Sequence, residues 1–255
     1  MGHSIVLITG ATSGIGQACA RRFAEGGYNL IVTGRRQDRL QSLQADLQAS
    51  FAVEVHPLVF DVRDRVACKA AIASLPPAWQ HIGLLINNAG LAAGMAPIDE
   101  GDAADWDRMI DTNVKGLLYV TQTVLPLLKA GKGTQIINIG STAAKDVYPN
   151  GNVYNATKFA VDALSRAMRI DLLSQGIKVT AIHPGAVETE FSVVRFKGDQ
   201  QKADQVYEGY TPLRPEDVAE TAFFCATRPA HVCINDLVLT CTDQANGLFI
   251  HRSES

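Results

Sequence analysis

The sequence predicts an α/β fold in which seven parallel strands form one doubly wound sheet, with helices covering both of its faces. Short apolar runs alternate with longer amphipathic stretches along the chain, a pattern typical of strands joined by helical crossovers. The strand runs are nearly all apolar and lack a period of two, as a sheet buried on both faces requires. Because no linker, repeat or low-complexity tract divides residues 1–228, we expect a single domain over residues 1–255.

The expected strands are short and rich in Ile, Val and Leu. They cover residues 5–9, 29–33, 54–60, 84–86, 135–139, 178–182 and 237–239. The expected helices cover residues 15–25, 37–49, 64–74, 103–129, 153–174 and 215–228. Residues 186–214 depart from this alternation because they are polar and show no strand pattern. Long loops of this kind commonly carry function, so we expect a substrate-binding lobe there.

Charge and composition exclude several classes of function. The 23 Lys and Arg residues are balanced by 26 Asp and Glu, so no basic surface is expected for nucleic acid or for a membrane. Five cysteines and six histidines show no metal-binding spacing, and we expect reduced thiols and no metal. The apolar run at residues 5–8 is too short for a signal peptide or a membrane span, which favours a cytoplasmic protein.

A glycine-rich turn links the first strand to the first helix and reads Gly10-Ala11-Thr12-Ser13-Gly14-Ile15-Gly16. Glycines allow a tight turn and a close backbone approach, so that a pyrophosphate can rest on the N–H groups at the start of the helix. The strand-to-helix context is the one such a motif needs, and it predicts a dinucleotide site. The alternative is a tight turn that binds no ligand.

The end of the second strand indicates which dinucleotide is bound. An acidic residue stands there in NAD sites, whereas this chain has Arg35 and Arg36 about 20 residues after the last glycine of the turn. A guanidinium pairs with a 2′-phosphate, so NADP(H) is favoured over NAD. The alternative is that both arginines are a solvated helix start.

Tyr154 and Lys158 are the candidate reaction centre. They are four residues apart on an expected helix and therefore share one face, where the lysine charge should lower the pKa of the tyrosine. Such a tyrosine can exchange a proton with a carbonyl or alcohol oxygen. Ser141 and the run Asn87-Asn88-Ala89-Gly90 follow other strands at the same carboxyl edge of the sheet, so one site should collect all of them.

With these motifs in order, the chain resembles the short-chain dehydrogenase/reductase family over essentially its whole length. The resemblance rests on residues 9–16, Asn87-Asn88-Ala89-Gly90, Asn113, Ser141, Tyr154, Lys158, Pro184-Gly185 and Thr189. It implies a nicotinamide-dependent oxidoreductase with a Rossmann-type fold and a homotetrameric assembly built partly from the helix that carries Tyr154.

The resemblance also implies a role for each of these residues. Tyr154 would be the acid/base, Ser141 would hold the substrate oxygen, Lys158 would bind the ribose, and Asn113 would position a relay water. The implied cofactor contacts are Gly10, Thr12, Ser13, Gly14, Ile15, Gly16, Arg35, Arg36, Asp61, Val62, Asn88, Ala89, Gly90, Tyr154, Lys158, Pro184, Gly185 and Thr189.

Segments 32–40, 189–199 and 229–232 carry a narrower resemblance, to NADP-dependent 3-hydroxy acid dehydrogenases and their sulfoacetaldehyde reductase relatives. It implies a small anionic hydroxy acid or aldehyde substrate, of the serine, allo-threonine, 3-hydroxypropionate or 3-hydroxyisobutyrate type. A sulfoacetaldehyde reductase, a broad-specificity carbonyl reductase and a non-catalytic NADP(H)-sensing protein are the alternatives. The segment 240–243 lacks the glycine pair usual in 3-oxoacyl-carrier-protein reductases, which disfavours that activity.

Arg195 is the expected ligand of the substrate anion, because a planar guanidinium can hold a carboxylate or sulfonate through two parallel bonds. Lys197 is the other cation nearby in the lobe. The alternative is that both cations are solvated, or that they pair with residues such as Glu190 and Asp199 and hold the lobe in shape.

Overall fold

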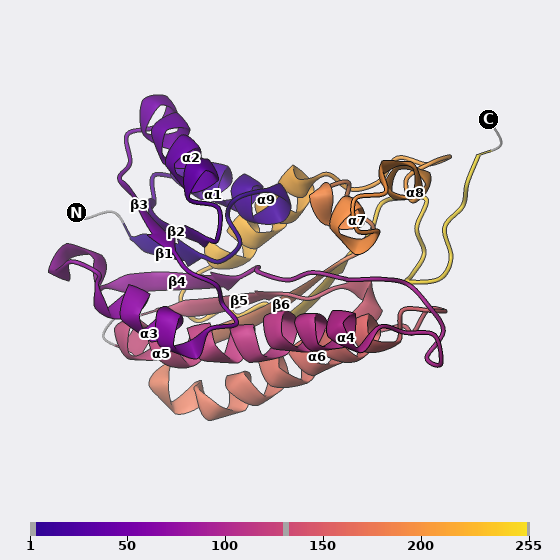
Figure 1. Ribbon diagram of the computed structural model, residues 1–255. Helices are drawn as coiled ribbons and strands as arrows, with labels where there is room; N and C mark the ends of the chain where they lie inside the picture. The colour runs from indigo at the N-terminus through magenta and orange to yellow at the C-terminus, as the bar shows by residue number, and fades with distance from the viewer. Residues whose placement is uncertain (1–3, 130–132, 254–255) are drawn as a thin grey trace.

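A computed structural model describes residues 4–129 and 133–253, and it contains the expected parallel sheet of seven strands (Figure 1). The ends of the predicted domain at residues 1–3 and 254–255 lie outside the described residues. The strand order is β3-β2-β1-β4-β5-β6-β7, and every neighbouring pair is parallel. The strands are β1 (Ile5–Ile8), β2 (Asn29–Gly34), β3 (Val55–Val59), β4 (Ile82–Asn87), β5 (Gln135–Ile139), β6 (Lys178–Pro184) and β7 (Asp236–Leu239).

Helices cover both faces of the sheet, as the doubly wound prediction requires. Figure 1 shows α1, α2 and α9 above the sheet and α3, α4, α5 and α6 below it. Their bounds are α1 (Gly14–Glu25), α2 (Gln37–Ser50), α3 (Arg65–Ala73), α4 (Ala103–Ile110), α5 (Leu117–Lys129), α6 (Asn152–Asp171) and α9 (Pro215–Ala226). Short 3₁₀ turns lie at Pro77–Trp79, Thr142–Ala144 and Leu173–Gln175. None of the described helices has the length and apolar character needed to cross a bilayer.

Two expectations about local structure were wrong. The helix expected over residues 103–129 is interrupted by a π-helical turn at Asp111–Gly116, where the Gly116 backbone packs closely against Val62. Residues 186–214, expected to be irregular, contain α7 (Glu190–Arg195) and α8 (Gln200–Gln205). The side chains of Thr189 and Asp199 accept backbone N–H groups at the starts of these two helices, which is how such short helices are capped.

Strand order determines where a ligand can bind. The chain moves outward from β1 to β2 and β3, and it then crosses back to place β4 on the other side of β1. At this reversal the two neighbouring crossovers run to opposite faces and leave a crevice at the carboxyl ends of β1 and β4. The glycine turn follows β1, and Asn88 follows β4, so both lie at this crevice.

Phe23 is the centre of the packing between α1 and α9. Its side chain is fully buried, and its ring lies edge-on to Tyr28 and Phe223 at centroid distances of 5.4 and 5.3 Å. Because α1 begins at the glycine turn, this contact fixes the helix whose first residues would meet a bound phosphate.

Replacing Phe23 with Ala should lower the free energy of unfolding by about 3–5 kcal/mol, because a large cavity would remain between α1 and α9. Urea unfolding followed by circular dichroism measures this loss. Val66→Ala is the control, since Val66 is 76% exposed on α3 and should change stability by less than about 0.5 kcal/mol. Equal losses in the two variants would contradict the packing role of Phe23.

Candidate active site

A cleft of about 340 Å³ opens at the carboxyl edge of the sheet. It is formed by the glycine turn and by the segments that follow β2, β3, β4, β5 and β6. The expected site residues that line it are Gly10, Thr12, Ser13, Gly14, Ile15, Arg35, Arg36, Asp61, Val62, Asn88, Ala89, Gly90, Ser141, Tyr154, Lys158, Pro184, Gly185 and Thr189.

The glycines of the turn meet different requirements. Gly10 and Gly14 have φ angles of +67° and +53°, a left-handed conformation that costs glycine little. Gly16 has no such angle and does not line the cleft. A Cβ atom on Gly16 would lie 2.3 Å from the carbonyl oxygen of Gly10, so this glycine lets α1 pack against the turn.

Thr9 and Asn88 join the glycine turn to the end of β4. The Asn88 amide donates to the carbonyl oxygens of Thr9 at 2.9 Å and Gly10 at 3.2 Å. In return the Thr9 hydroxyl accepts the backbone N–H groups of Asn88 and Ala89, both at 3.0 Å. These bonds leave the N–H groups at the start of α1 facing the cleft, where an anion can accept them.

Arg36 reaches the glycine turn, whereas Arg35 points away from it. The Arg36 guanidinium donates to the hydroxyls of Thr12 at 2.9 Å and Ser13 at 3.0 Å. Arg35 instead faces Asp61 at 3.8 Å. Arg36 therefore holds a positive charge beside the glycine turn.

Glu190 at the start of α7 contacts the same arginine. Its carboxylate lies 3.2 Å from Arg36 and 2.7 Å from Arg39, and both arginines lower the pKa of Glu190. The three side chains are 40–47% exposed, so the ion pairs contribute little to stability. They do connect the lobe to the segment after β2 across the mouth of the cleft.

Ser141, Tyr154 and Lys158 meet at the inner end of the cleft. Ser141 follows β5, and its hydroxyl lies close to Tyr154 and accepts the N–H of Ala143 at 3.1 Å. Lys158 lies one helical turn after Tyr154 on α6 and donates to the carbonyl oxygen of Ile139 at 3.1 Å. The ammonium is 5.8 Å from the centre of the tyrosine ring.

Burial shifts the pKa values of Tyr154 and Lys158 in opposite directions. Burial raises the pKa of Tyr154, with Tyr148 adding to the shift, while Arg195 and the Ser141 hydrogen bond oppose it. The lowered pKa expected from the Tyr154–Lys158 spacing is therefore not found in this structure. Burial also lowers the pKa of Lys158 to about 8, which weakens its charge. At neutral pH Tyr154 is a neutral phenol that can donate a proton.

Asn113 lies in the π-helical turn and is almost fully buried. Its amide donates to the carbonyl oxygen of Leu91 at 2.8 Å and to the hydroxyl of Thr157 at 3.0 Å, and its oxygen accepts the N–H of Leu91. The side chain thus joins the segment after β4 to α6. Asn113 does not line the cleft, so its side chain is not in position to contact a water there.

The segment after β6 is braced by Gln244, which the sequence analysis missed. The Gln244 side-chain oxygen accepts the N–H of Ala186 at 2.8 Å. A Cβ atom on Gly185 would lie 2.0 Å from that oxygen, so a larger residue there would displace the Gln244 side chain. No motif marks Gln244, because it comes from a loop about 60 residues later in the chain.

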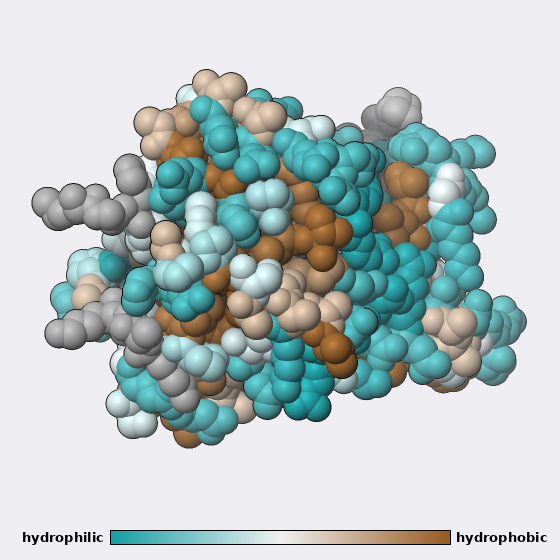
Figure 2. All heavy atoms as spheres, turned by 60° about the vertical axis from the view of Figure 1, so that its left-hand side comes forward, coloured by the Kyte–Doolittle hydropathy of each residue, from teal (hydrophilic) through white to brown (hydrophobic). Residues whose placement is uncertain are grey.

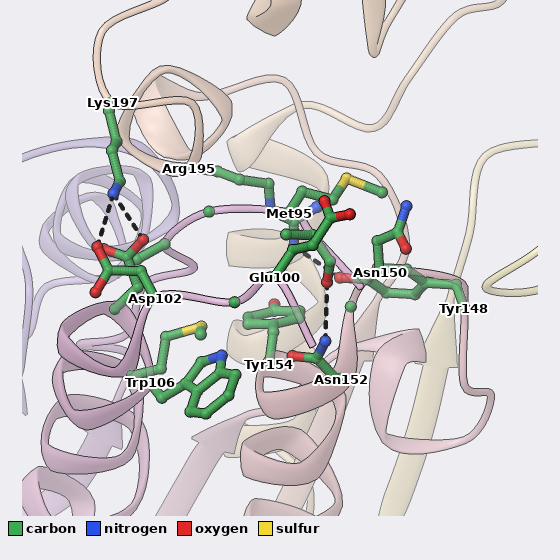
Figure 3. Close-up of a pocket in the computed structure, with 17 residues that line it drawn as sticks. Met95, Glu100, Asp102, Trp106, Tyr148, Asn150, Asn152, Tyr154, Arg195 and Lys197 are labelled. Carbon is green, nitrogen blue, oxygen red and sulfur yellow. Dashed lines mark hydrogen bonds and ion pairs between the residues drawn. The ribbon is translucent and has the colours of Figure 1, made fainter. Parts of the chain in front are cut away.

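A second pocket of about 200 Å³ adjoins the cleft at Tyr154 (Figure 3). Trp106 from α4, Tyr148 from the segment before α6 and Arg195 from α7 surround the tyrosine ring. None of the sequence motifs predicted Trp106, Tyr148 or Asn152 as lining residues. Tyr148 and Asn152 lie in the segment between Ser141 and Tyr154, and that proximity is the signal that could have indicated them.

Arg195 and Lys197, two of the cations of the lobe, differ in their partners. Lys197 pairs with Asp102 at 3.4 Å and with Asp105 at 2.8 Å. Arg195 donates to the hydroxyl of Tyr148 at 2.7 Å and lies over the Tyr154 ring at 4.9 Å. Among the described residues it has no carboxylate partner, so its charge is the one left to meet an anion.

Comparison with known proteins finds relatives that match this chain over almost its whole length. A family model described as short chain dehydrogenase matches residues 4–200. Sulfoacetaldehyde reductase 2 of Chromohalobacter salexigens is 50% identical over 246 residues, which are 96% of this chain and 97% of that protein. The NADP-dependent 3-hydroxy acid dehydrogenase YdfG of Escherichia coli is 48% identical over 250 residues, which are 97% and 99% of the two chains.

Among solved structures, the closed form of serine dehydrogenase complexed with NADP+ resembles this chain with a TM-score of 0.90 and 48% identity. The match covers 98% of this chain and 100% of that one. The similarity therefore includes the lobe at residues 186–214, part of which lies beyond the segment that the family model matches.

The lowered pKa of Lys158 predicts a specific dependence of stability on pH. Below pH 8 the folded chain holds a buried ammonium at a cost on the order of 3 kcal/mol. Between pH 8 and 10.5 the unfolded chain keeps this proton while the folded chain loses it, so this group adds stability as pH rises. In Lys158→Met that gain is absent.

Relative to wild type, Lys158→Met should therefore be most stable below pH 8. The difference in unfolding free energy, variant minus wild type, should decrease by up to about 3 kcal/mol toward pH 10.5. Urea unfolding at pH 7 and pH 10 measures the change. Lys69→Met on the exposed side of α3 should show no such pH dependence. A difference between Lys158→Met and wild type that is the same at both pH values would refute a buried ammonium.

Proposed function

The chain belongs to the short-chain dehydrogenase family, and on that premise we propose that it is an NADP(H)-dependent oxidoreductase that interconverts a small 3-hydroxy acid and its carbonyl form. The observation that carries this proposal is the position of Tyr154, a buried proton donor between the cleft of about 340 Å³ and a pocket whose free cation is Arg195. Relatives at 48–50% identity are named for a hydroxy acid and for sulfoacetaldehyde, both of which are small anionic compounds.

The residues of the cleft fit NADP(H). Backbone N–H groups at the start of α1 suit the pyrophosphate, and Arg36 with Thr12 and Ser13 suits the 2′-phosphate. Asp61 and Val62 would border the adenine, while Thr189 and the Pro184-Gly185 turn would border the nicotinamide. When bound, the cofactor supplies or accepts the hydride.

In the direction of reduction, Tyr154 donates its phenolic proton to the carbonyl oxygen of the substrate. The Ser141 hydroxyl holds the same oxygen, and Lys158 stabilises the phenolate that results from the transfer. Arg195 binds the carboxylate of the substrate and thereby orients the reacting carbon. Since the Asn113 side chain is already engaged, a relay water would be held by its backbone oxygen.

A sulfoacetaldehyde reductase is the second candidate, favoured by the 50% identical relative of that name. A guanidinium binds a sulfonate as well as a carboxylate, so Arg195 serves both substrates. A non-catalytic sensor of NADP(H) would not need Ser141, Tyr154 and Lys158 together, and their presence disfavours that role.

We also propose a cytoplasmic homotetramer in which residues 1–255 form one domain and residues 186–214 form its substrate lobe. Figure 2 shows apolar patches within a largely hydrophilic face. Apolar side chains are exposed on α5 and α6, including Leu118 at 37% and Phe159 at 41%. A second copy of the chain packed against α5 and α6 would cover them.

Purified protein should oxidise serine, 3-hydroxypropionate or a hydroxysulfonate with NADP, measured as reduced cofactor at 340 nm. NAD should support a lower kcat/KM. Tyr154→Phe should lower turnover by about 10²–10⁴-fold while NADPH still binds, because only the proton donor is removed. Absence of turnover across acids, sulfonates and neutral carbonyls, with NADPH bound tightly, would instead favour the sensor.

Arg36 should determine cofactor preference. The double variant Arg35→Ala, Arg36→Asp should reverse the ratio of kcat/KM for NADP over NAD, because each charge-assisted bond to the 2′-phosphate contributes about 1.5–3 kcal/mol. Arg21→Ala is the control, since Arg21 pairs with Asp46 away from the cleft. An unaltered ratio in the double variant would show that the 2′-phosphate is held elsewhere.

Arg195→Met should lower kcat/KM for an acid by about 10- to 150-fold while sparing an uncharged alcohol. The comparison of the two substrates matters because Arg195 also lies over Tyr154, and a loss of that contact would affect both substrates equally. Lys197→Met should leave the acid-to-alcohol ratio unchanged, because Asp102 and Asp105 already neutralise Lys197. Equal losses on both substrates in Arg195→Met would assign Arg195 to the support of the lobe.

A further inference from the structure

A fully buried histidine lies directly behind the Ser141 backbone. His183 on β6 has no exposed surface, and its Nδ1 atom is 3.4 Å from the backbone nitrogen and 3.2 Å from the carbonyl oxygen of Ser141. The residue before Ser141 is glycine, and a Cβ atom on Gly140 would lie 2.3 Å from the same Nδ1. The imidazole is thus packed against the turn that carries the Ser141 hydroxyl into the cleft.

Charged side chains surround the other edge of the imidazole. The Nε2 atom forms no well-aligned hydrogen bond among the described residues, but Asp236 on β7 lies 3.0 Å from it and Asp162 on α6 lies 3.5 Å from it. The ammonium of Lys145 contacts both carboxylates, at 2.6 and 3.1 Å. A metal ion could be held by the spacing of Asp162, His183 and Asp236. The Lys145 ammonium, however, already occupies the position that such an ion would take.

This arrangement determines which imidazole nitrogen carries the proton. A lone pair on Nε2 would face two carboxylates and be repelled by them, whereas an N–H there is attracted. Burial and Lys145 lower the pKa of His183, while Asp236, Asp162 and the Ser141 backbone raise it, and the net shift is downward. The ring is therefore neutral near pH 7, with its proton on Nε2. The Nδ1 atom is then left as an acceptor for the N–H of Ser141.

We propose that His183 is a positioning residue for the reaction: its Nδ1 atom accepts the Ser141 N–H and so fixes the hydroxyl that holds the substrate oxygen. Asp236 and Asp162 act through His183 by keeping the proton on Nε2. This inference rests on the proposed function, because it assumes that Ser141 holds the substrate oxygen. His183 itself does not line the cleft and touches neither substrate nor cofactor.

Two substitutions of His183 distinguish the role of Nδ1 from the role of Nε2. The side-chain amide of His183→Asn can present an oxygen near the position of Nδ1, whereas the longer side chain of His183→Gln reaches toward the position of Nε2 and leaves the Ser141 N–H without an acceptor. We expect kcat to fall on the order of 10-fold or more in His183→Gln and to remain within about threefold of wild type in His183→Asn. NADPH binding, measured by fluorescence titration, should be unchanged in both variants because the glycine turn is untouched.

Equal kcat values in the two variants would overturn the inference, whether both are lowered or both are normal, because a merely structural role does not distinguish the two edges. Wild type is assayed in parallel with the acid that it turns over best. An inactive wild type would overturn the proposed function and this inference together, whereas an active wild type with equal variants would overturn this inference alone.

A second comparison applies if His183→Gln does not fold. Asp236→Asn should lower kcat in the wild-type background, because the imidazole can then place its proton on Nδ1. In the His183→Asn background the same change should have no further effect, because the asparagine amide has no such alternative. The same fold-loss in both backgrounds would mean that Asp236 acts through Lys145, and it would overturn the inference.

Discussion

The pairing of β1 with β4 is the constraint on which the rest of the structure depends. It reverses the order of the sheet and brings the turn after β1 beside the segment after β4. Thr9 and Asn88 then join the two by four hydrogen bonds, so contacts within the protein already hold the glycine turn in place. The turn can therefore offer its N–H groups to a ligand without being ordered by that ligand.

Burial governs the chemistry of α6. Tyr154 and Lys158 lie on its inner face, and the removal of water disfavours the charged form of each. The phenol keeps its proton and the ammonium gives its proton up more readily, so that at neutral pH Tyr154 is neutral while Lys158 is still mostly charged. A bound phosphate or ribose changes this balance by adding charge and hydrogen bonds, so the site is organised for a charged partner.

The sequence was sufficient for the order of elements and for most of the cleft, because both follow from local patterns. Apolar runs and glycines identify each strand and the turn after β1, and the carboxyl edge then collects the residues that follow the strands. The protonation of Tyr154 was not predictable in this way, since helical spacing places Lys158 nearby but says nothing of how deeply both are buried. Gln244 and His183 act through contacts with distant segments, and no local motif marks them. The π-helical turn at Asp111–Gly116 also escaped prediction, because the apolar pattern continues through it.

The contact of Glu190 with Arg36 and Arg39 has a consequence for how ionic strength acts on the site. A phosphate entering an unpaired arginine site gains attraction that salt weakens steeply. Here the phosphate must replace a carboxylate that salt weakens as well, so the two effects partly cancel. The internal carboxylate would thus make the affinity of the cleft for a phosphate less sensitive to changes in salt.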